Sequence, residues 1–163
     1  MPKFSVSRSS AFTAQQVYDV VADIEAYPQF VPLCRSATVN RRRVEPNGLV
    51  HLSTSLEIAY PKLAILEHLK TEVVLNPVKL HIRSTSDTPP VKHLNSLWRF
   101  HSSPQGGCEV EYVLDYQLAS RSLQLLLSGM VDWAARKMLA AFEARARAIY
   151  AGSPAPVAGN KSI

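Results

Sequence analysis

The sequence predicts an α+β fold in which one curved antiparallel sheet of about six to seven strands packs against a long C-terminal helix. Two observations lead to this prediction. Segments of the first 118 residues alternate apolar and polar side chains between turn signals, as antiparallel strands do. From about residue 120 to 151 the apolar period becomes helical, over about 45 Å at 1.5 Å per residue. One helix across a strongly curved sheet leaves a cleft between the two layers.

Seven strands are expected in chain order, at residues 3–9, 36–44, 49–59, 65–75, 79–84, 94–101 and 109–118. Asn47-Gly48 and Asn76-Pro77 mark the turns of two hairpins, and residues 86–90 are a loop by composition. Apolar and polar side chains alternate most regularly in the last strand, so one of its faces is expected to be buried and the other exposed to solvent. Its inward residues are Val110, Tyr112, Leu114, Tyr116 and Leu118.

A short helix precedes this sheet region. Thr13 and Gln16 fit a capping box, and Phe12 and Val17 fit the hydrophobic staple around it. Pro28 then blocks the helix, and an irregular apolar corner is expected to follow. The apolar residues of this corner are Tyr27, Phe30, Val31 and Leu33. They either plug one end of the core or cover a ligand, and the pattern alone favours the plug.

The C-terminal helix carries an apolar stripe of mixed flexible and small side chains. The stripe consists of Leu123, Leu127, Met130, Ala134, Met138, Ala141 and Phe142. Such residues either leave a void that adapts to a ligand or fit a close contact between helix and sheet. The pattern leaves both alternatives open. Residues 1–152 are expected to form a single domain and residues 153–163 a disordered tail.

The composition is that of an ordinary soluble protein, with 47% hydrophobic and 19% charged residues among 163. The start of the chain lacks a secretory signal, and Cys34 and Cys108 have no CxxC spacing, which favours a cytoplasmic location. The net charge of +5 fits either nucleic acid or a phospholipid surface. Its local peak is Arg41, Arg42 and Arg43, beside a predicted hairpin turn. No pattern typical of specific DNA binding supports the nucleic-acid alternative.

No catalytic residue and no metal site are expected. The five histidines include no HExxH pair, and His68 with Glu72 fits a surface pair on a strand better than a metal site. The sequence contains no GxSxG, GxxxxGK[ST] or GxGxxG motif. Cys34 has apolar neighbours, which favours a buried structural thiol over a nucleophile.

The stretch VADIEAYPQFVPLC, residues 21–34, resembles the opening signature of the coenzyme-Q-binding START-domain proteins, also labelled polyketide cyclase/dehydrase-like. The segments LWRF at 97–100, CEV at 108–110 and MLAAFEARA at 138–146 are similar to that family too. The resemblance covers residues 3–152. It implies a helix-grip fold of the START/Bet v type, in which the sheet and the helix enclose a hydrophobic tunnel.

The resemblance also implies a function. The tunnel would bind ubiquinone or a related isoprenoid lipid as a chaperone or carrier, without catalysis and with no cofactor besides that ligand. This role would support respiratory electron transport or quinone biosynthesis. The implied ligand contacts are Tyr27, Phe30, Val31, Leu33, Leu56, Ile58, Trp98, Phe100, Tyr112, Leu114, Tyr116, Met130, Ala134 and Met138.

Two other functions stay open at this point. Some bacterial members of the family are labelled ribosome association toxin, so the large ribosomal subunit is an alternative partner. An aromatase or cyclase is the other alternative; it needs a polar, proton-shuttling interior, whereas the alternating strands predict an apolar one. For the carrier, Arg41, Arg42 and Arg43 are the expected contact with anionic lipid on the cytoplasmic face of the inner membrane.

Overall fold

The computed structural model describes residues 3–60 and 64–151. Within these ranges the chain forms one sheet, two α-helices and one 3₁₀ helix. In chain order the elements are β1 (Lys3–Ser10), α1 (Ala14–Ala22), the 3₁₀ helix η1 (Ile24–Gln29), β2 (Cys34–Val44), β3 (Val50–Tyr60), β4 (Ile65–Asn76), β5 (His81–Ser86), β6 (Val91–Ser102), β7 (Cys108–Leu118) and α2 (Arg121–Tyr150). The predicted tail at residues 153–163 lies outside the described residues.

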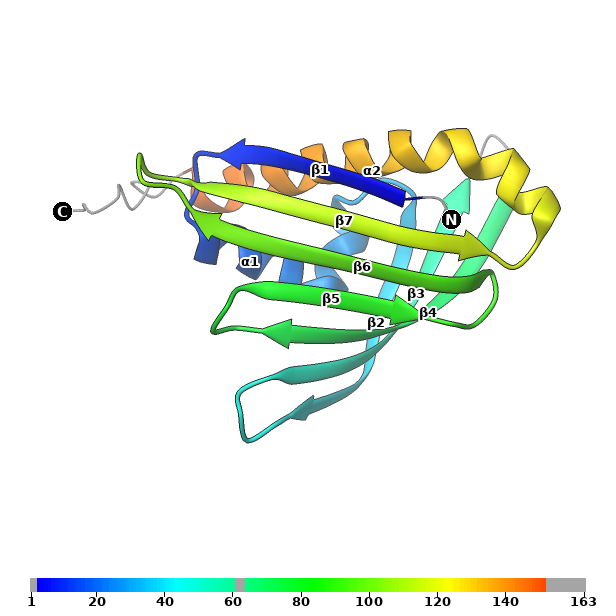
Figure 1. Cartoon of the computed structure of the whole chain (residues 1–163), viewed down its shortest axis with the longest axis horizontal. Helices are drawn as coiled ribbons and strands as arrows, with labels where there is room; N and C mark the ends of the chain where they lie inside the picture. The colour runs from blue at the N-terminus through cyan, green and yellow to red at the C-terminus, as the bar shows by residue number, and fades with distance from the viewer. Residues whose placement is uncertain (1–2, 61–63, 152–163) are drawn as a thin grey trace.

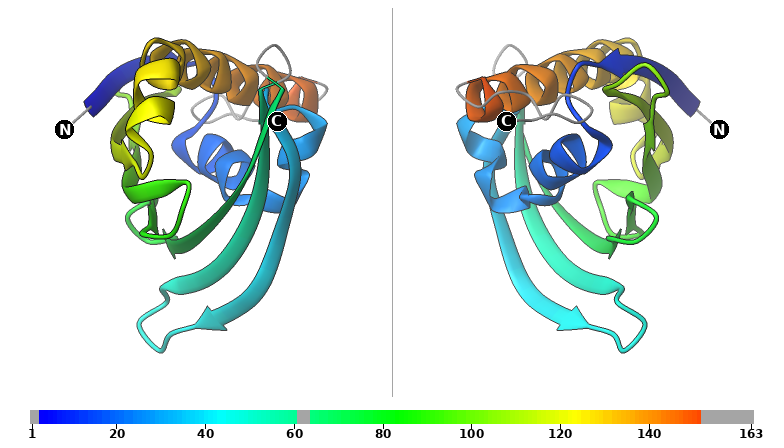
Figure 2. Two further views of the ribbon diagram at one scale, coloured as in Figure 1. Left: turned by 90° about the vertical axis from the view of Figure 1, so that its right-hand side faces the viewer. Right: turned by 90° about the vertical axis from the view of Figure 1, so that its left-hand side faces the viewer.

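All seven strands belong to one antiparallel sheet in the order β1-β7-β6-β5-β4-β3-β2. From β2 to β7 each strand pairs with its neighbour in the chain, and β1 completes the sheet by pairing with β7. The sheet curves around α1, and α2 lies across its concave side (Figure 1 and Figure 2). The structure thus confirms the helix-grip architecture that the sequence predicts.

The predicted start of α1 is confirmed. The Thr13 hydroxyl accepts from the backbone N–H of Gln16 at 3.0 Å, and the Gln16 side chain accepts from the N–H of Thr13 at 3.0 Å. These two bonds satisfy backbone donors that the first helical turn leaves open. The apolar side of α1 enters the core through Ala14, Val17, Tyr18, Val20 and Val21.

Thr13→Ala should lower the free energy of unfolding by about 1 kcal/mol, because the N–H of Gln16 loses its side-chain acceptor. Chemical denaturation followed by circular dichroism measures the change. Thr13→Ser keeps the hydroxyl and is the matched control, which should retain most of the stability. If both substitutions had the same effect, the hydroxyl would not be what stabilises the helix start.

The segment after α1 differs in part from the expected irregular corner. Ile24–Gln29, which includes Tyr27, forms the 3₁₀ helix η1 with Pro28 inside it, whereas Phe30, Val31 and Leu33 are irregular as expected. The Phe30 N–H donates to the Tyr27 carbonyl at 3.1 Å and closes a tight turn. Pro28 takes the second place of that turn, where its fixed φ is favourable and no N–H is required. α1 itself ends at Ala22, before the proline, and Pro28 lies within the 3₁₀ helix that follows.

Three strands begin two or more residues from their predicted starts, and β2 is the first of them, since it begins at Cys34 rather than at residue 36. β5 begins at His81 rather than at residue 79. The reason is that the Asn76 side chain accepts from the backbone N–H groups of Val78 and Lys79, at 3.2 and 3.0 Å. This Asx turn redirects the chain before the strand starts. β6 begins at Val91 rather than at residue 94, directly after the predicted loop at residues 86–90.

α2 is the predicted long helix, and the Ser120 hydroxyl caps it by accepting from the N–H of Leu123 at 3.2 Å. Its buried side is turned by about one residue from the predicted stripe. Met130 and Ala141 are only half-buried. The buried side chains of α2 are Leu127, Ala135, Leu139, Phe142 and Ala146. Leucine and alanine occur on several sides of this helix, so periodicity did not fix the buried side.

Candidate ligand-binding cavity

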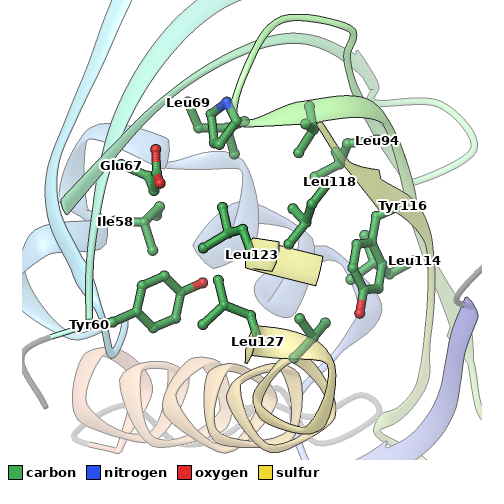
Figure 3. Close-up of a pocket in the computed structure, with 13 residues that line it drawn as sticks. Ile58, Tyr60, Glu67, Leu69, Leu94, Leu114, Tyr116, Leu118, Leu123 and Leu127 are labelled. Carbon is green, nitrogen blue, oxygen red and sulfur yellow. The ribbon is translucent and has the colours of Figure 1, made fainter. Parts of the chain in front are cut away.

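Three adjoining pockets lie between the concave face of the sheet and α2. The leucine-lined pocket, of about 160 Å³, lies between β3, β4, β6, β7 and the first turns of α2 (Figure 3). The corner pocket, of about 240 Å³, lies between the segment after η1, β3, β7 and the middle of α2. The central pocket, of about 200 Å³, lies over the middle of the sheet against Trp98 and Phe142.

The three pockets share walls. Leu114 lines all of them, and Leu69 and Leu94 line both the leucine-lined and the central pocket. The corner pocket shares Ile58, Tyr60 and Val131 with the leucine-lined pocket, and Tyr27, Leu56, Tyr112 and Met138 with the central pocket. We call these three adjoining, mainly apolar pockets beneath α2 the hollow; spaces of this kind bind small molecules.

Most of the predicted ligand contacts line this hollow. They are Tyr27, Val31, Leu33, Leu56, Ile58, Trp98, Tyr112, Leu114, Tyr116, Ala134 and Met138. Phe30, Phe100 and Met130 do not line the three pockets. The Phe30 ring lies 5.3 Å from that of Phe142, and the Phe100 ring stacks on Trp98 at 5.9 Å. Contact of any of these residues with a ligand remains a prediction.

The walls also contain residues that the sequence pattern did not single out. Tyr60 and Glu67 lie on neighbouring strands at the leucine-lined pocket, and Figure 3 shows the Tyr60 hydroxyl directed toward its middle. β4 contributes Glu67, Leu69, Thr71 and Val73 to the hollow. Their spacing of two was the available signal, because alternate residues of a strand share one face.

A row of hydroxyl side chains crosses the central pocket, one from each of five neighbouring strands. The hydroxyl row consists of Thr54 of β3, Thr71 of β4, Ser84 of β5, Ser96 of β6 and Tyr112 of β7. Thr54 and Thr71 are register partners whose hydroxyls bond to each other, and a side-chain hydrogen bond joins Ser96 to Tyr112. The expectation of an apolar interior is therefore wrong along this row.

Trp98 and Phe142 close the inner end of the central pocket. Their rings meet edge to face with centroids 5.2 Å apart, and both side chains are almost wholly buried. They also line a separate pocket of about 240 Å³, whose polar residues include Arg8, Glu143 and Arg147. The aromatic pair is therefore the partition between the hollow and this second space.

The phenols around the hollow stay protonated at neutral pH. Burial raises the pKa of Tyr27, whose hydroxyl donates to the Val21 carbonyl, and it raises the pKa of Tyr112 as well. The pKa of Tyr60 is raised first by burial and then by the nearby Glu67 carboxylate. Protonated phenols both donate and accept hydrogen bonds, so these groups can serve a neutral polar ligand.

Both cysteines are buried, as expected of structural thiols, and burial raises the pKa of Cys34 and of Cys108 from 9.0 to about 11. At pH 8 the folded protein should therefore react with a thiol reagent about a hundredfold more slowly than the unfolded chain, since the thiolate is the reacting form. Absorbance assays with and without denaturant measure the two rates. Equal rates would make Cys34, which lines the corner pocket, a candidate nucleophile again.

Within residues 3–60 and 64–151, no group of three His, Cys, Asp or Glu residues is placed to hold a metal ion. His68 and Glu72 are both exposed on one face of β4, as expected of surface residues, but they do not contact each other. His68 instead lies 3.5 Å from Glu57 across the β3–β4 ladder, and Glu72 accepts from Ser53 at 2.9 Å. Both contacts are on the outer face of the sheet, away from the hollow.

The arginine run does not reach the hollow. Arg41, Arg42 and Arg43 are exposed on the edge strand β2, and their register partners on β3, His51, Leu52 and Ser53, line none of the three pockets. The exposed apolar residues Leu126 and Trp133 lie instead on the part of α2 that lines the hollow. In the described part of the chain, no helix has the length and apolar character needed to cross a membrane.

Comparison with known proteins gives relatives of three kinds. Coenzyme Q-binding protein COQ10 homolog B, mitochondrial, of Xenopus laevis is 28% identical over 159 residues, 96% of this chain and 62% of that protein. Ribosome association toxin RatA of Escherichia coli is 25% identical over 150 residues, 92% of this chain and 90% of the toxin. The Zhui aromatase/cyclase of Streptomyces superposes with a TM-score of 0.76 over 94% of this chain and 99% of that chain, at 16% identity.

These relatives carry different weight. This chain spans only 62% of the length of the Xenopus protein, and the aromatase/cyclase is similar in fold alone. A family model described as polyketide cyclase/dehydrase and lipid transport matches residues 10–143, which is well over half of the chain. The chain therefore belongs to the polyketide cyclase/dehydrase and lipid transport family.

Proposed function

We propose that the protein binds an isoprenoid lipid, ubiquinone or a close relative, beneath α2 and carries or shields it without changing it chemically. The observation that supports this most is the mainly apolar hollow with leucine side chains on its walls. Each CH₂ group removed from water contributes about 0.8 kcal/mol, so a long chain needs few polar contacts. The quinone is the favoured ligand because the Xenopus relative is named for binding coenzyme Q.

Native mass spectrometry and organic extraction of gently purified protein test this proposal. We expect a co-purifying ubiquinone or menaquinone at one molecule per chain, or uptake of an added short-chain quinone. An unrelated protein of similar size, purified from the same cells, is the control for carry-over of membrane lipid. Protein that is empty and also rejects short-chain quinones would contradict the proposal.

Binding to the large ribosomal subunit is the second candidate function. It is supported by the RatA relative, which matches over 92% of this chain, and by the net charge of +5. Co-sedimentation with ribosomes at physiological salt separates the two functions. The carrier should stay in the supernatant, whereas a ribosome-binding protein should appear in the pellet with the large subunit.

A cyclase function has weaker support. Moving protons to and from a substrate requires positioned acids and bases. The described lining of the central pocket supplies hydroxyls and no carboxylate or imidazole, and Glu67, the one carboxylate among the described linings of the three pockets, lies in the leucine-lined pocket away from this row. The hydroxyl row is therefore better suited to bind an oxygenated ligand than to catalyse its conversion.

We further expect peripheral contact with anionic membranes, in which exposed cations contribute roughly 1 kcal/mol each near the surface. Flotation with vesicles containing anionic phospholipid should show binding that weakens as salt is raised. Vesicles of neutral phosphatidylcholine are the control. Replacing Arg41, Arg42 and Arg43 by serine should reduce the binding, and salt-insensitive binding or none would contradict this expectation.

A further inference from the structure

The two ends of the hollow differ in chemistry, and we propose that this difference sets the direction of the ligand. An oxygenated ring, a quinone or hydroquinone, lies in the central pocket against the hydroxyl row, and its hydrocarbon chain runs out through the leucine-lined pocket. The inference rests on the proposed function and adds a ring subsite and a direction to it. Four observations carry it: the hydroxyls, the aromatic walls, the leucine passage and the placement of Glu67.

The hydroxyls are buried but retain hydrogen-bonding capacity. Thr54, Thr71 and Ser96 are 2%, 5% and 6% exposed. A hydroxyl has one donor and two acceptor sites, so a pair that shares one bond keeps further sites. The bond from the Thr54 hydroxyl to the Thr71 carbonyl is long, at 3.3 Å, and is readily exchanged for a ligand oxygen. The row can therefore donate to a ring carbonyl and accept from a ring hydroxyl.

The walls of the same pocket suit a flat ring. The rings of Trp98 and Tyr112 lie 4.6 Å apart, and Phe142 meets Trp98 edge to face. Aromatic side chains in these geometries pack well on a further ring. Because Trp98 and Phe142 also close the inner end of the central pocket, a ring there has its substituent chain directed back along the hollow.

Aliphatic side chains line the passage from the central pocket to the leucine-lined pocket. Leu69, Leu94 and Leu114 line both pockets and join the hydroxyl row to the leucine side chains around the first turns of α2. The opposite direction is disfavoured by the half-buried Glu67, which lies in the leucine-lined pocket. A carboxylate has only acceptors, as do the oxygens of a quinone, so the carboxylate repels the ring in its oxidised form.

Fluorescence of Trp98 tests where the ring lies. The chain has two tryptophans, so Trp133→Phe leaves Trp98 as the single reporter, and the exposed position of Trp133 makes this change mild. Ubiquinone with two isoprene units is the probe, because a quinone quenches an indole that it contacts. We expect saturable quenching with the same Kd as calorimetry gives. Calorimetric binding without quenching would overturn the proposed direction.

The double variant Thr54→Val/Thr71→Val tests the hydroxyls. It removes both partners of one bond with side chains of the same shape, so the fold should be kept. Affinity for the two-isoprene ubiquinone should fall about tenfold, the equivalent of one hydrogen bond, while an isoprenoid hydrocarbon without a ring should bind unchanged. Thr38→Val, at an exposed position of β2, is the matched control.

The binding measurements distinguish failure of the ring subsite from failure of the proposed carrier function. Equal weakening of the ring ligand and the hydrocarbon, or no weakening of either, would overturn the ring subsite while leaving the carrier function in place. If neither compound bound the unmodified protein in the calorimeter, the proposed function would fail, and the subsite with it.

Discussion

Phe142→Ala should lower the free energy of unfolding by about 3–5 kcal/mol, the usual loss when a large aromatic side chain is removed from a core. Phe142 is 2% exposed. Its ring lies 5.3 Å from those of Tyr27 and Phe30 and 5.2 Å from that of Trp98. The side chain thus joins η1, β6 and α2, and a cavity at this point loosens all three. Denaturant titration followed by circular dichroism measures the loss.

Phe12→Ala is the matched control, because Phe12 is only half-buried and makes a ring contact with Tyr150 at 5.9 Å. Phe12→Ala should lower the free energy of unfolding clearly less than Phe142→Ala does. Equal losses would mean that the aromatic cluster around Phe142 is not the centre of the core. The Phe142 substitution also removes half of the partition in the hollow, so the hollow should merge with the pocket beside Arg8 and Arg147.

The strands and both helices could be predicted from the sequence because each has a local cause. Alternation along β7 places Val110, Tyr112, Leu114 and Tyr116 inward, and the Thr13 capping box marks where α1 begins. The buried side of α2 could not be predicted in the same way. Ala135 and Leu139 are buried only because the helix is rotated to fit the curved sheet, and that rotation is a tertiary property.

The hydroxyl row is a part of the site that could not be predicted from the sequence. Each of its members occupies an inward place in its own strand, but threonine and serine in a strand are usually taken as outward-facing. Whether these hydroxyls lie next to one another depends on the register of the strands, which places Thr54 beside Thr71 and Ser84 beside Ser96. Leu33 is a second case: it lines the corner pocket with a φ of 70°, a left-handed conformation that nothing in its residue type predicts.

Ala134→Trp should lower ligand affinity while leaving the protein folded, because the corner pocket shares the walls of Ile58, Tyr60 and Val131 with the leucine-lined pocket through which the chain is proposed to run. Ala134 lies on α2 at the corner pocket of about 240 Å³, so an indole built there occupies empty space. Excluding about four CH₂ groups of a ligand, at about 0.8 kcal/mol each, corresponds to about a hundredfold loss of affinity. Calorimetry with short-chain ubiquinone and quantification of co-purifying lipid measure this loss.

Ala140→Trp is the control, because Ala140 is exposed on the same helix and its indole would lie in solvent. It should bind as the unmodified protein does, and both variants should unfold cooperatively. A folded Ala134→Trp protein that retains full affinity would mean that the ligand avoids the corner pocket. The proposed pose in the central and leucine-lined pockets would then stand, and the walls shared with the corner pocket would not transmit the effect of the indole. Loss of binding in both variants would instead point to a contact on the outer face of α2, and the hollow would not be the binding site.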